Sequence, residues 1–290
     1  MEKLPNFAGL TGDYSDLERS RIVILPVPFD LTSSWIKGSD LGPKALLEAS
    51  KNLELYDIET ESEVYDLGIH TSEPINAGTS EEMVKKVGTV VESLNKKGKF
   101  TVIIGGEHSV SIGAIKSHAK GGNITIVQLD AHSDLRDEYE GDKYSHACVM
   151  ARAKEVAPIV QIGIRSMDSS ELSRLEKDSA FFAKDVYDND KWIDKAIGKC
   201  KDKVYVTIDL DVFDPSIMPS TGTPEPGGLD WYLALKFLKK LSEKREIVGF
   251  DIVELCPNPQ NKAPDFMAAK LVYTLLSYIF GKEAKAGKAC

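Results

Sequence analysis

The sequence predicts an α/β fold, a single three-layer domain in which a mainly parallel sheet is flanked by helices. Three observations support this prediction. Short apolar runs rich in β-branched residues recur along the 290 residues, segments with helical spacing lie between them, and no linker rich in Pro, Gly or Ser divides the chain. A hydrophobic content of 42% is sufficient for one sizeable core.

The expected strands are apolar throughout, as strands buried on both faces are. In chain order they span residues 21–27, 100–106, 124–130, 158–164, 203–210 and 246–255. The expected helices carry apolar residues three and four positions apart and span residues 40–53, 80–98, 231–244 and 264–280. Ser80 and Asp230 are candidate helix caps, Gly98 follows a helix end, and the Lys-rich tail 281–290 is expected to be a frayed, solvated end.

Composition excludes several classes of function. A net charge of −9 argues against nucleic acid or an anionic membrane as the main partner and is compatible with cationic ligands. The four cysteines are widely spaced, so neither a disulfide framework nor a thiolate zinc site is indicated. The longest apolar stretch is too short to span a bilayer, and the N-terminus lacks an export signal. We therefore expect a soluble, cytoplasmic protein.

Polar residues stand at the ends of four predicted strands, each at the same point along its strand. In chain order they are Glu107, His108, Asp130, His132, Asp134, Asp209, Asp211, Asp214 and Glu254. Open α/β sheets bind their ligands outside the carboxyl ends of the strands. The pattern therefore predicts that these side chains meet in one site at one edge of the sheet.

Some of these groups have an ordinary explanation when they stand alone. A single His108 after two glycines is typical of a cap or a surface residue, and an Asp-Leu-Asp segment is typical of a turn. Asp130, His132 and Asp134 differ, because alternate positions of an extended chain point to one side. Burying such groups unpaired would cost on the order of several kcal/mol each. A positive charge is therefore expected among them.

Carboxylates and neutral imidazoles together suit a divalent ion of the manganese, iron or zinc type. Six such groups stand at three strand ends: His108, Asp130, His132, Asp134, Asp209 and Asp211. One ion that keeps a coordination position open needs fewer ligands, so two ions that share carboxylates fit better. Four aspartates would balance the charge of two dications, and a hydroxide with one further acid would leave the pocket negative. Such a pocket favours a cationic substrate, and paired metals generate hydroxide at neutral pH.

Three segments resemble, in order and spacing, the signatures of the ureohydrolases, the arginase and agmatinase family of binuclear manganese hydrolases. They are GGEHS (105–109), DAHSD (130–134) and TIDLDVFDP (207–215). The segments ILPVPFDLTSSWIKGSDLGPKALLEAS (24–50) and DIVELCP (251–257) are also similar to the family. The resemblance implies an arginase-like fold, with one ureohydrolase domain over residues 1–290 and its core at about 20–280.

The resemblance implies two Mn²⁺ ions per subunit. One would be bound by His108, Asp130, Asp134 and Asp209. The other would be bound by Asp130, His132, Asp209 and Asp211, so that Asp130 and Asp209 bridge the pair. Ligand spacing leaves cobalt, iron and nickel open as the metal in the cell.

The resemblance also implies three catalytic residues. Asp134 would fix the orientation of a bridging hydroxide through a hydrogen bond, and Glu254 would pair with the guanidinium. His146 would relay protons to the leaving amine, a role that an ordinary pKa of about 6.5 suits. Asp214 is expected to support the site from outside or to form the turn with Pro215.

The substrate is expected to be a small cationic guanidino compound. Arg136 and Asp142 stand near the places where arginases hold the amino-acid end of arginine, so that clamp is expected to be absent. Agmatine, cleaved to putrescine and urea, is the leading expectation; aminopropylagmatine, cleaved to spermidine and urea, is the alternative, followed by arginine, guanidinobutyrate and formiminoglutamate. Glu138 or Asp142 is a candidate for the ammonium end, provided that Arg136 is paired.

Lys37 and Cys256 depart from the family pattern in loops expected to shape the pocket. Two other classes stay open. Deacetylases that share the fold use a single zinc, and His108 and Asp211 argue against them; a non-enzymatic, metal-binding regulatory subunit is the other alternative. A homotrimer or homohexamer is implied by the resemblance alone.

Overall fold

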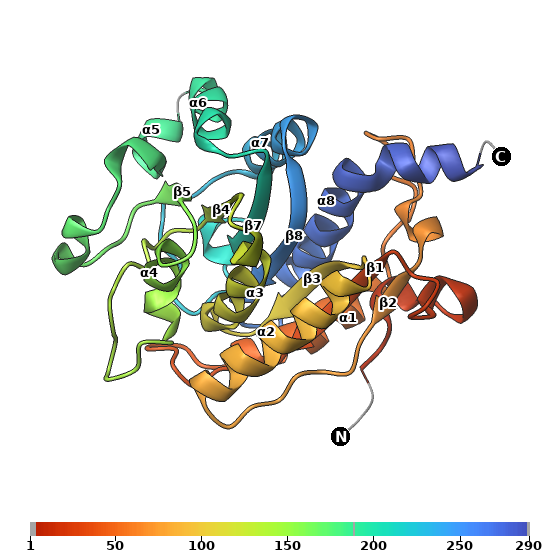
Figure 1. The fold of residues 1–290 in the computed structure, drawn as a ribbon, viewed down its shortest axis with the longest axis horizontal. Helices are drawn as coiled ribbons and strands as arrows, with labels where there is room; N and C mark the ends of the chain where they lie inside the picture. Colours follow the sequence, from red (N-terminus) through yellow and green to blue (C-terminus); the bar gives the residue numbers. More distant parts are fainter. Residues whose placement is uncertain (1–3, 188, 289–290) are drawn as a thin grey trace.

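Eight parallel strands form one sheet in the computed structural model, which describes residues 4–187 and 189–288. The order across the sheet is β2-β1-β3-β8-β7-β4-β5-β6 (Figure 1). The strands are β1 (Ile22–Val27), β2 (Ile69–Thr71), β3 (Phe100–Gly105), β4 (Ile124–Leu129), β5 (Ile159–Ile164), β6 (Ala180–Phe182), β7 (Lys203–Asp209) and β8 (Glu246–Val253). The predicted parallel sheet is confirmed.

Helices cover both faces of the sheet and complete three layers (Figure 1). On one face, a single apolar cluster joins the strands to α1 (Gly42–Ser50), α6 (Lys191–Lys199), α7 (Trp231–Lys244) and α8 (Ala263–Lys288). On the other face, a second cluster includes α2 (Ser80–Lys96), α3 (Ser111–His118) and α4 (Val149–Lys154). The short α5 (Ala183–Val186) follows β6 at the sheet edge.

The strands supply side chains to both clusters in alternation. In β3, Val102 and Ile104 belong to the first cluster, whereas Ile103 belongs to the second. Successive side chains of a strand point to opposite faces, so a strand covered on both sides is apolar at most of its positions. This explains the mainly apolar runs that mark the strands in the sequence.

Several local expectations need correction. Thr79, not Ser80, caps α2, because its hydroxyl accepts the amide proton of Glu82; Asp230 caps α7 as predicted. The expected frayed tail is wrong up to Lys288, because α8 continues to that residue and buries Ala284 against the core; residues 289–290 lie outside the described part. The short strands β2 and β6 were not predicted, since three residues are too few to show a periodic pattern.

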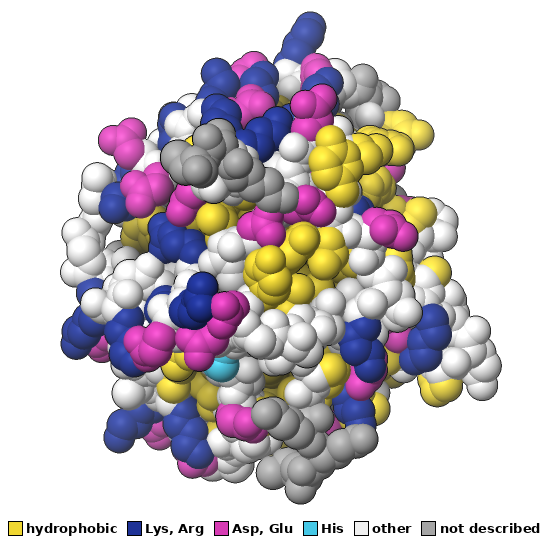
Figure 2. Space-filling view, turned by 90° about the vertical axis from the view of Figure 1, so that its right-hand side faces the viewer, with side chains coloured by type: hydrophobic (Ala, Val, Ile, Leu, Met, Phe, Trp, Pro, Cys, Tyr) yellow, Lys and Arg dark blue, Asp and Glu magenta, His cyan; other side chains and the backbone are white. Residues whose placement is uncertain are grey.

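The surface seen in Figure 2 mixes charges of both signs, with Lys and Arg side chains beside Asp and Glu. Among the surface ion pairs, Lys239 lies 3.0 Å from Glu59. Within the described residues, no helix is long and apolar enough to cross a membrane.

The strand order places four of the predicted site segments next to one another. β3, β8, β7 and β4 are consecutive neighbours in the middle of the sheet and run parallel. Their carboxyl ends therefore lie along one edge of the sheet. The sequence motifs that follow these strands must meet there.

Candidate metal centre

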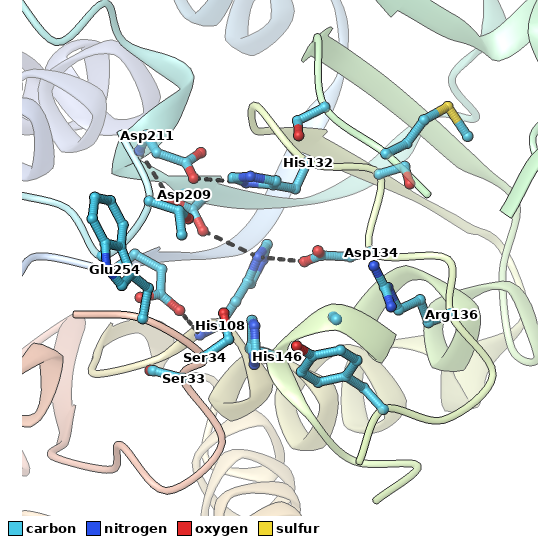
Figure 3. A pocket seen from close by; sticks show the side chains of 18 of the residues that line it. Ser33, Ser34, His108, His132, Asp134, Arg136, His146, Asp209, Asp211 and Glu254 are labelled. Carbon is cyan, nitrogen blue, oxygen red and sulfur yellow. Dashed lines mark hydrogen bonds and ion pairs between the residues drawn. The ribbon is translucent and has the colours of Figure 1, made fainter. Parts of the chain in front are cut away.

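All six residues that the sequence predicts as metal ligands come together at this edge of the sheet. Figure 3 shows five of them, His108, His132, Asp134, Asp209 and Asp211. His108 follows β3, and Glu254 follows β8. Asp130, His132 and Asp134 lie in the loop after β4, whereas Asp209 and Asp211 lie at the end of β7. Two groups within the cluster have the spacing of metal sites: His108, Asp130 and Asp209 form one, and Asp130, His132 and Asp211 form the other.

His108 stands among three carboxylates. Its Nδ1 lies 3.1 Å from Asp130, 3.0 Å from Asp134 and 3.4 Å from Asp209. These are the three residues predicted to share the first ion with it. Nδ1 is buried and has no well-directed hydrogen bond within the described chain. A nitrogen lone pair facing three carboxylates fits a position beside a cation.

His132 forms the second group on the other side of Asp130. Its Nδ1 lies 2.8 Å from Asp211 and 3.7 Å from Asp130. Asp130 therefore lies between the two imidazoles, where a bridging carboxylate would have to stand. Asp209 accepts the amide proton of Asp211 at 2.9 Å, which fixes the turn at the end of β7.

Two site residues adopt a backbone conformation that non-glycine residues rarely adopt. Asp134 has φ 51° and Glu254 has φ 64°. A left-handed conformation of this kind costs roughly 1–2 kcal/mol and persists where the surrounding structure enforces it. In both cases the backbone turn directs a carboxylate into the cluster.

A chain of buried hydrogen bonds determines which nitrogen of His108 faces the carboxylates. Nε2 of His108 lies 2.8 Å from Oγ1 of Thr207, which donates its proton to Asp251 at 2.7 Å. Tyr205 donates to the other oxygen of Asp251 at 2.8 Å. Because the only hydroxyl proton of Thr207 is used, its oxygen must accept the proton on Nε2. Nδ1 is thereby left with a lone pair for a metal.

The crowding of carboxylates shifts the pKa values of the cluster. Burial, followed by the charge of Asp130, raises the pKa of Asp134 to about 7; burial, followed by Asp211 and Asp130, raises that of Asp209. Burial favours the neutral ring of His132, but Asp211 and Asp130 outweigh it and raise its pKa to about 12. Without metal, this cluster therefore holds protons that divalent ions would replace. Oxygen and imidazole donors in the absence of thiolate fit manganese and related ions.

His146 lines the same pocket as the cluster (Figure 3). The centre of its ring lies 5.6 Å from that of Tyr139. Burial, with the positive charges of His108 and His132, lowers its pKa to about 4. This value is below the ordinary one assumed from the sequence, so the ring is neutral at pH 7. A neutral imidazole can accept a proton and pass it on.

Loops after β1, β4, β5 and β7 form the walls of the pocket. The residues outside the metal cluster that line it include Ser33, Ser34, Trp35, Ile36, Arg136, Tyr139, His146, Ser166, Met167, Asp168, Glu171, Gly222, Thr223 and Glu254. Glu138 and Asp142, considered in the sequence for the far end of the substrate, do not line it. Lys37 and Cys256 also lie outside this lining; Lys37 instead contacts Asp30 at 3.3 Å.

Arg136 does not present a free positive charge to the pocket. Its guanidinium lies 3.6 Å from Glu171 and 3.8 Å from Asp168, and it stacks over Tyr139 at 4.8 Å. Two carboxylates against one guanidinium leave this wall with an excess negative charge. The sequence analysis missed Asp168 and Glu171, although they follow the strand at 158–164 just as the predicted ligands follow theirs.

Asp214 supports the turn, one of the two roles considered for it. Its carboxylate accepts the amide protons of Ser216 at 3.0 Å and Gly227 at 2.8 Å. The hydrogen bond from the side chain of Ser216, followed by that from its backbone amide, lowers the pKa of Asp214 to about 2. Asp214 therefore fixes the loop that follows β7 and is not part of the pocket lining.

Comparisons with known proteins agree with this geometry. A sequence profile of the Arginase family matches residues 20–277. The N(1)-aminopropylagmatine ureohydrolase of Synechocystis sp. is 40% identical over 89% of this chain and 88% of its own length. The agmatinase of Pyrococcus horikoshii is 33% identical over 93% and 94%. The crystal structure of agmatine ureohydrolase of Thermoplasma volcanium matches 98% of this chain and 97% of its own, with a TM-score of 0.88 and 32% identity.

The role of Thr207 can be tested by Thr207→Val, which keeps the shape and removes the hydroxyl. We expect Mn²⁺ affinity to fall about 10- to 100-fold, because the Nε2 proton of His108 loses its acceptor. Thr101→Val is the matched control, since the buried Thr101 hydroxyl has no hydrogen-bond partner within the described chain. Titration of metal into both variants measures the effect. Equal affinity in Thr207→Val and the wild type would contradict this account.

Proposed function

The chain belongs to the arginase family of binuclear metal hydrolases, and on that premise we propose that it cleaves a guanidino compound with a cationic tail, releasing urea. The observation that supports this most is the cluster of four aspartates and two histidines at the carboxyl ends of the central strands. The same cluster disfavours a deacetylase with a single zinc ion, because His108 and Asp211 raise the number of ligands above what one ion needs.

We propose two divalent ions as cofactors, with Mn²⁺ as the first candidate. The residues that would hold them are His108, Asp130, His132, Asp134, Asp209 and Asp211. When bound, such a pair polarises the substrate and lowers the pKa of water so that hydroxide forms near neutral pH.

Glu254 is proposed to hold the guanidinium. Its Oε1 accepts the amide proton of His108 at 2.6 Å, which fixes the side chain and leaves Oε2 free for the substrate. Burial, followed by the charge of Glu107, raises the pKa of Glu254. A bound guanidinium would oppose that shift, so the site favours a cationic group here.

Asp134 and His146 are proposed to handle the protons. Asp134, directed into the cluster by its left-handed backbone, would orient the attacking water and accept its proton. Hydrolysis adds that oxygen to the guanidinium carbon and breaks the bond from this carbon to the substituted nitrogen. His146, neutral at pH 7, would accept the proton that Asp134 takes from the water and give it to the departing amine.

The outer wall indicates the kind of tail. Arg136 is occupied by Asp168 and Glu171, so this wall has no free cation for an α-carboxylate and carries an excess negative charge instead. Agmatine and N1-aminopropylagmatine both end in an ammonium group. Trp35, which is 70% exposed, and Ile36 line the same pocket and offer apolar surface for additional methylenes. Together with the name of the 40% identical relative, this favours N1-aminopropylagmatine, with agmatine as the second candidate.

We further propose one domain over the whole chain, a cytoplasmic location, and a homotrimer or homohexamer. The free thiols of Cys148, Cys200 and Cys256 are compatible with a reducing compartment. The domain and the oligomer rest on the family resemblance.

The proposed activity is tested by urea release from manganese-loaded protein, with substrates compared by kcat/KM. We expect N1-aminopropylagmatine and agmatine to exceed arginine by at least about 30-fold, because an α-carboxylate near Asp168 and Glu171 costs about 2 kcal/mol or more. A preference for arginine would overturn the assignment of the tail. No urea from any of the three compounds would overturn the proposed function.

Asp168 is the residue we expect to attract the ammonium end. Asp168→Asn should raise KM for agmatine about 2- to 5-fold, the effect of a solvent-exposed ion pair, with kcat unchanged. The matched control is Glu138→Gln, which removes an exposed charge from the neighbouring loop outside the pocket lining. Steady-state kinetics of both variants measure the difference. An equal KM in the two variants would remove Asp168 from substrate binding.

A further inference from the structure

Glu107 is fully buried and binds the loop that follows β1. Its Oε2 accepts the amide protons of Thr32 at 2.6 Å and Ser33 at 3.0 Å. Its Oε1 accepts the hydroxyl protons of Thr32 at 2.7 Å and Ser109 at 2.6 Å. Three of the four donors to this carboxylate belong to the loop, so they hold it against the turn that presents His108.

The same threonine contacts His146. Its Oγ1 accepts the amide proton of His146 at 3.0 Å and lies 3.2 Å from the ring nitrogen Nδ1. Because the hydroxyl proton of Thr32 goes to Glu107, this oxygen can only accept from the ring. An unprotonated Nδ1 would place two lone pairs against each other. The contact therefore favours the tautomer with the proton on Nδ1.

Asp30, which precedes Thr32, closes the same loop by accepting the amide protons of Gly38 at 2.7 Å and Ser39 at 3.1 Å. Ser145 Oγ also lies 3.2 Å from Nδ1 of His146; a hydroxyl can donate or accept, so this contact fits either tautomer and the assignment rests on Thr32. Nε2 is then the nitrogen available to the pocket that His146 lines.

We propose that Thr32, oriented by Glu107, is a positioning residue for His146, which keeps the proton on Nδ1 and presents an unprotonated Nε2 to the pocket. This inference rests on the proton-transfer role in the proposed function. Glu107 directly precedes His108, so one turn after β3 would place both a metal ligand and, through Thr32, the proton carrier. A neutral histidine accepts a proton only at its unprotonated nitrogen, so the tautomer decides which nitrogen of His146 takes part in proton transfer.

Thr32→Val tests the inference, because Val has the shape of Thr and leaves Glu107 three of its four donors. We expect kcat to fall about 10- to 100-fold with KM and metal content unchanged, whereas Thr32→Ser should stay within about 3-fold of the wild type. In a His146→Ala background, Thr32→Val should cause no further loss. An equal loss in both backgrounds, or an equal loss in Thr32→Ser and Thr32→Val, would overturn the inference.

The tautomer can be measured without turnover, which separates this inference from the proposed function. In protein labelled with ¹⁵N-histidine and loaded with diamagnetic zinc, the signal missing from His146→Ala identifies His146. We expect a protonated Nδ1 and an unprotonated Nε2 in the wild type and in Thr32→Ser, and a mixture of tautomers in Thr32→Val. The same tautomer in Thr32→Val as in the wild type would overturn the inference, even if urea release confirmed the function.

Discussion

The main constraint on this structure is electrostatic. The fold buries several carboxylates around two imidazoles, where the carboxylates repel one another. Asp130, Asp134 and Asp209 all lie within 3.4 Å of one ring nitrogen of His108. Burial and the charges of neighbouring carboxylates raise the pKa values of Asp134 and Asp209, and this retention of protons is the constraint in a metal-free site. A pair of divalent ions removes it and at the same time supplies the chemistry of a hydrolase.

The interior of the sheet is built to hold this cluster in place. Polar side chains interrupt otherwise apolar strands where they support a ligand from behind. Thr207 and Asp251 set the tautomer of His108, and Gln128 donates to Asp130 at 2.7 Å while accepting from Gln161 at 2.6 Å. Buried polar groups are costly unless they are satisfied, so their presence in the central strands reflects the demands of the site rather than those of the core.

Much of the site could be predicted because its residues stand in short sequence segments that directly follow strands. Asp130, His132 and Asp134 alternate directly after a strand, and a parallel sheet brings such segments to one edge. The pairing of Arg136 with Glu171, and the link from Glu107 through Thr32 to His146, join residues far apart in the chain. No short pattern encodes these contacts, which is why Glu138 was considered for the substrate's far end and Asp168 was missed. The cap of α2 was likewise predicted one residue away, at Ser80 instead of Thr79, because both adjacent residues carry a hydroxyl.

The most direct test of the central claim is the position of metal in crystals of the manganese-loaded protein, measured by anomalous scattering at the manganese edge. The account predicts two peaks per chain, one beside His108 and Asp134 and one beside His132 and Asp211, with Asp130 and Asp209 between them. A single peak, or none within the cluster, would contradict it.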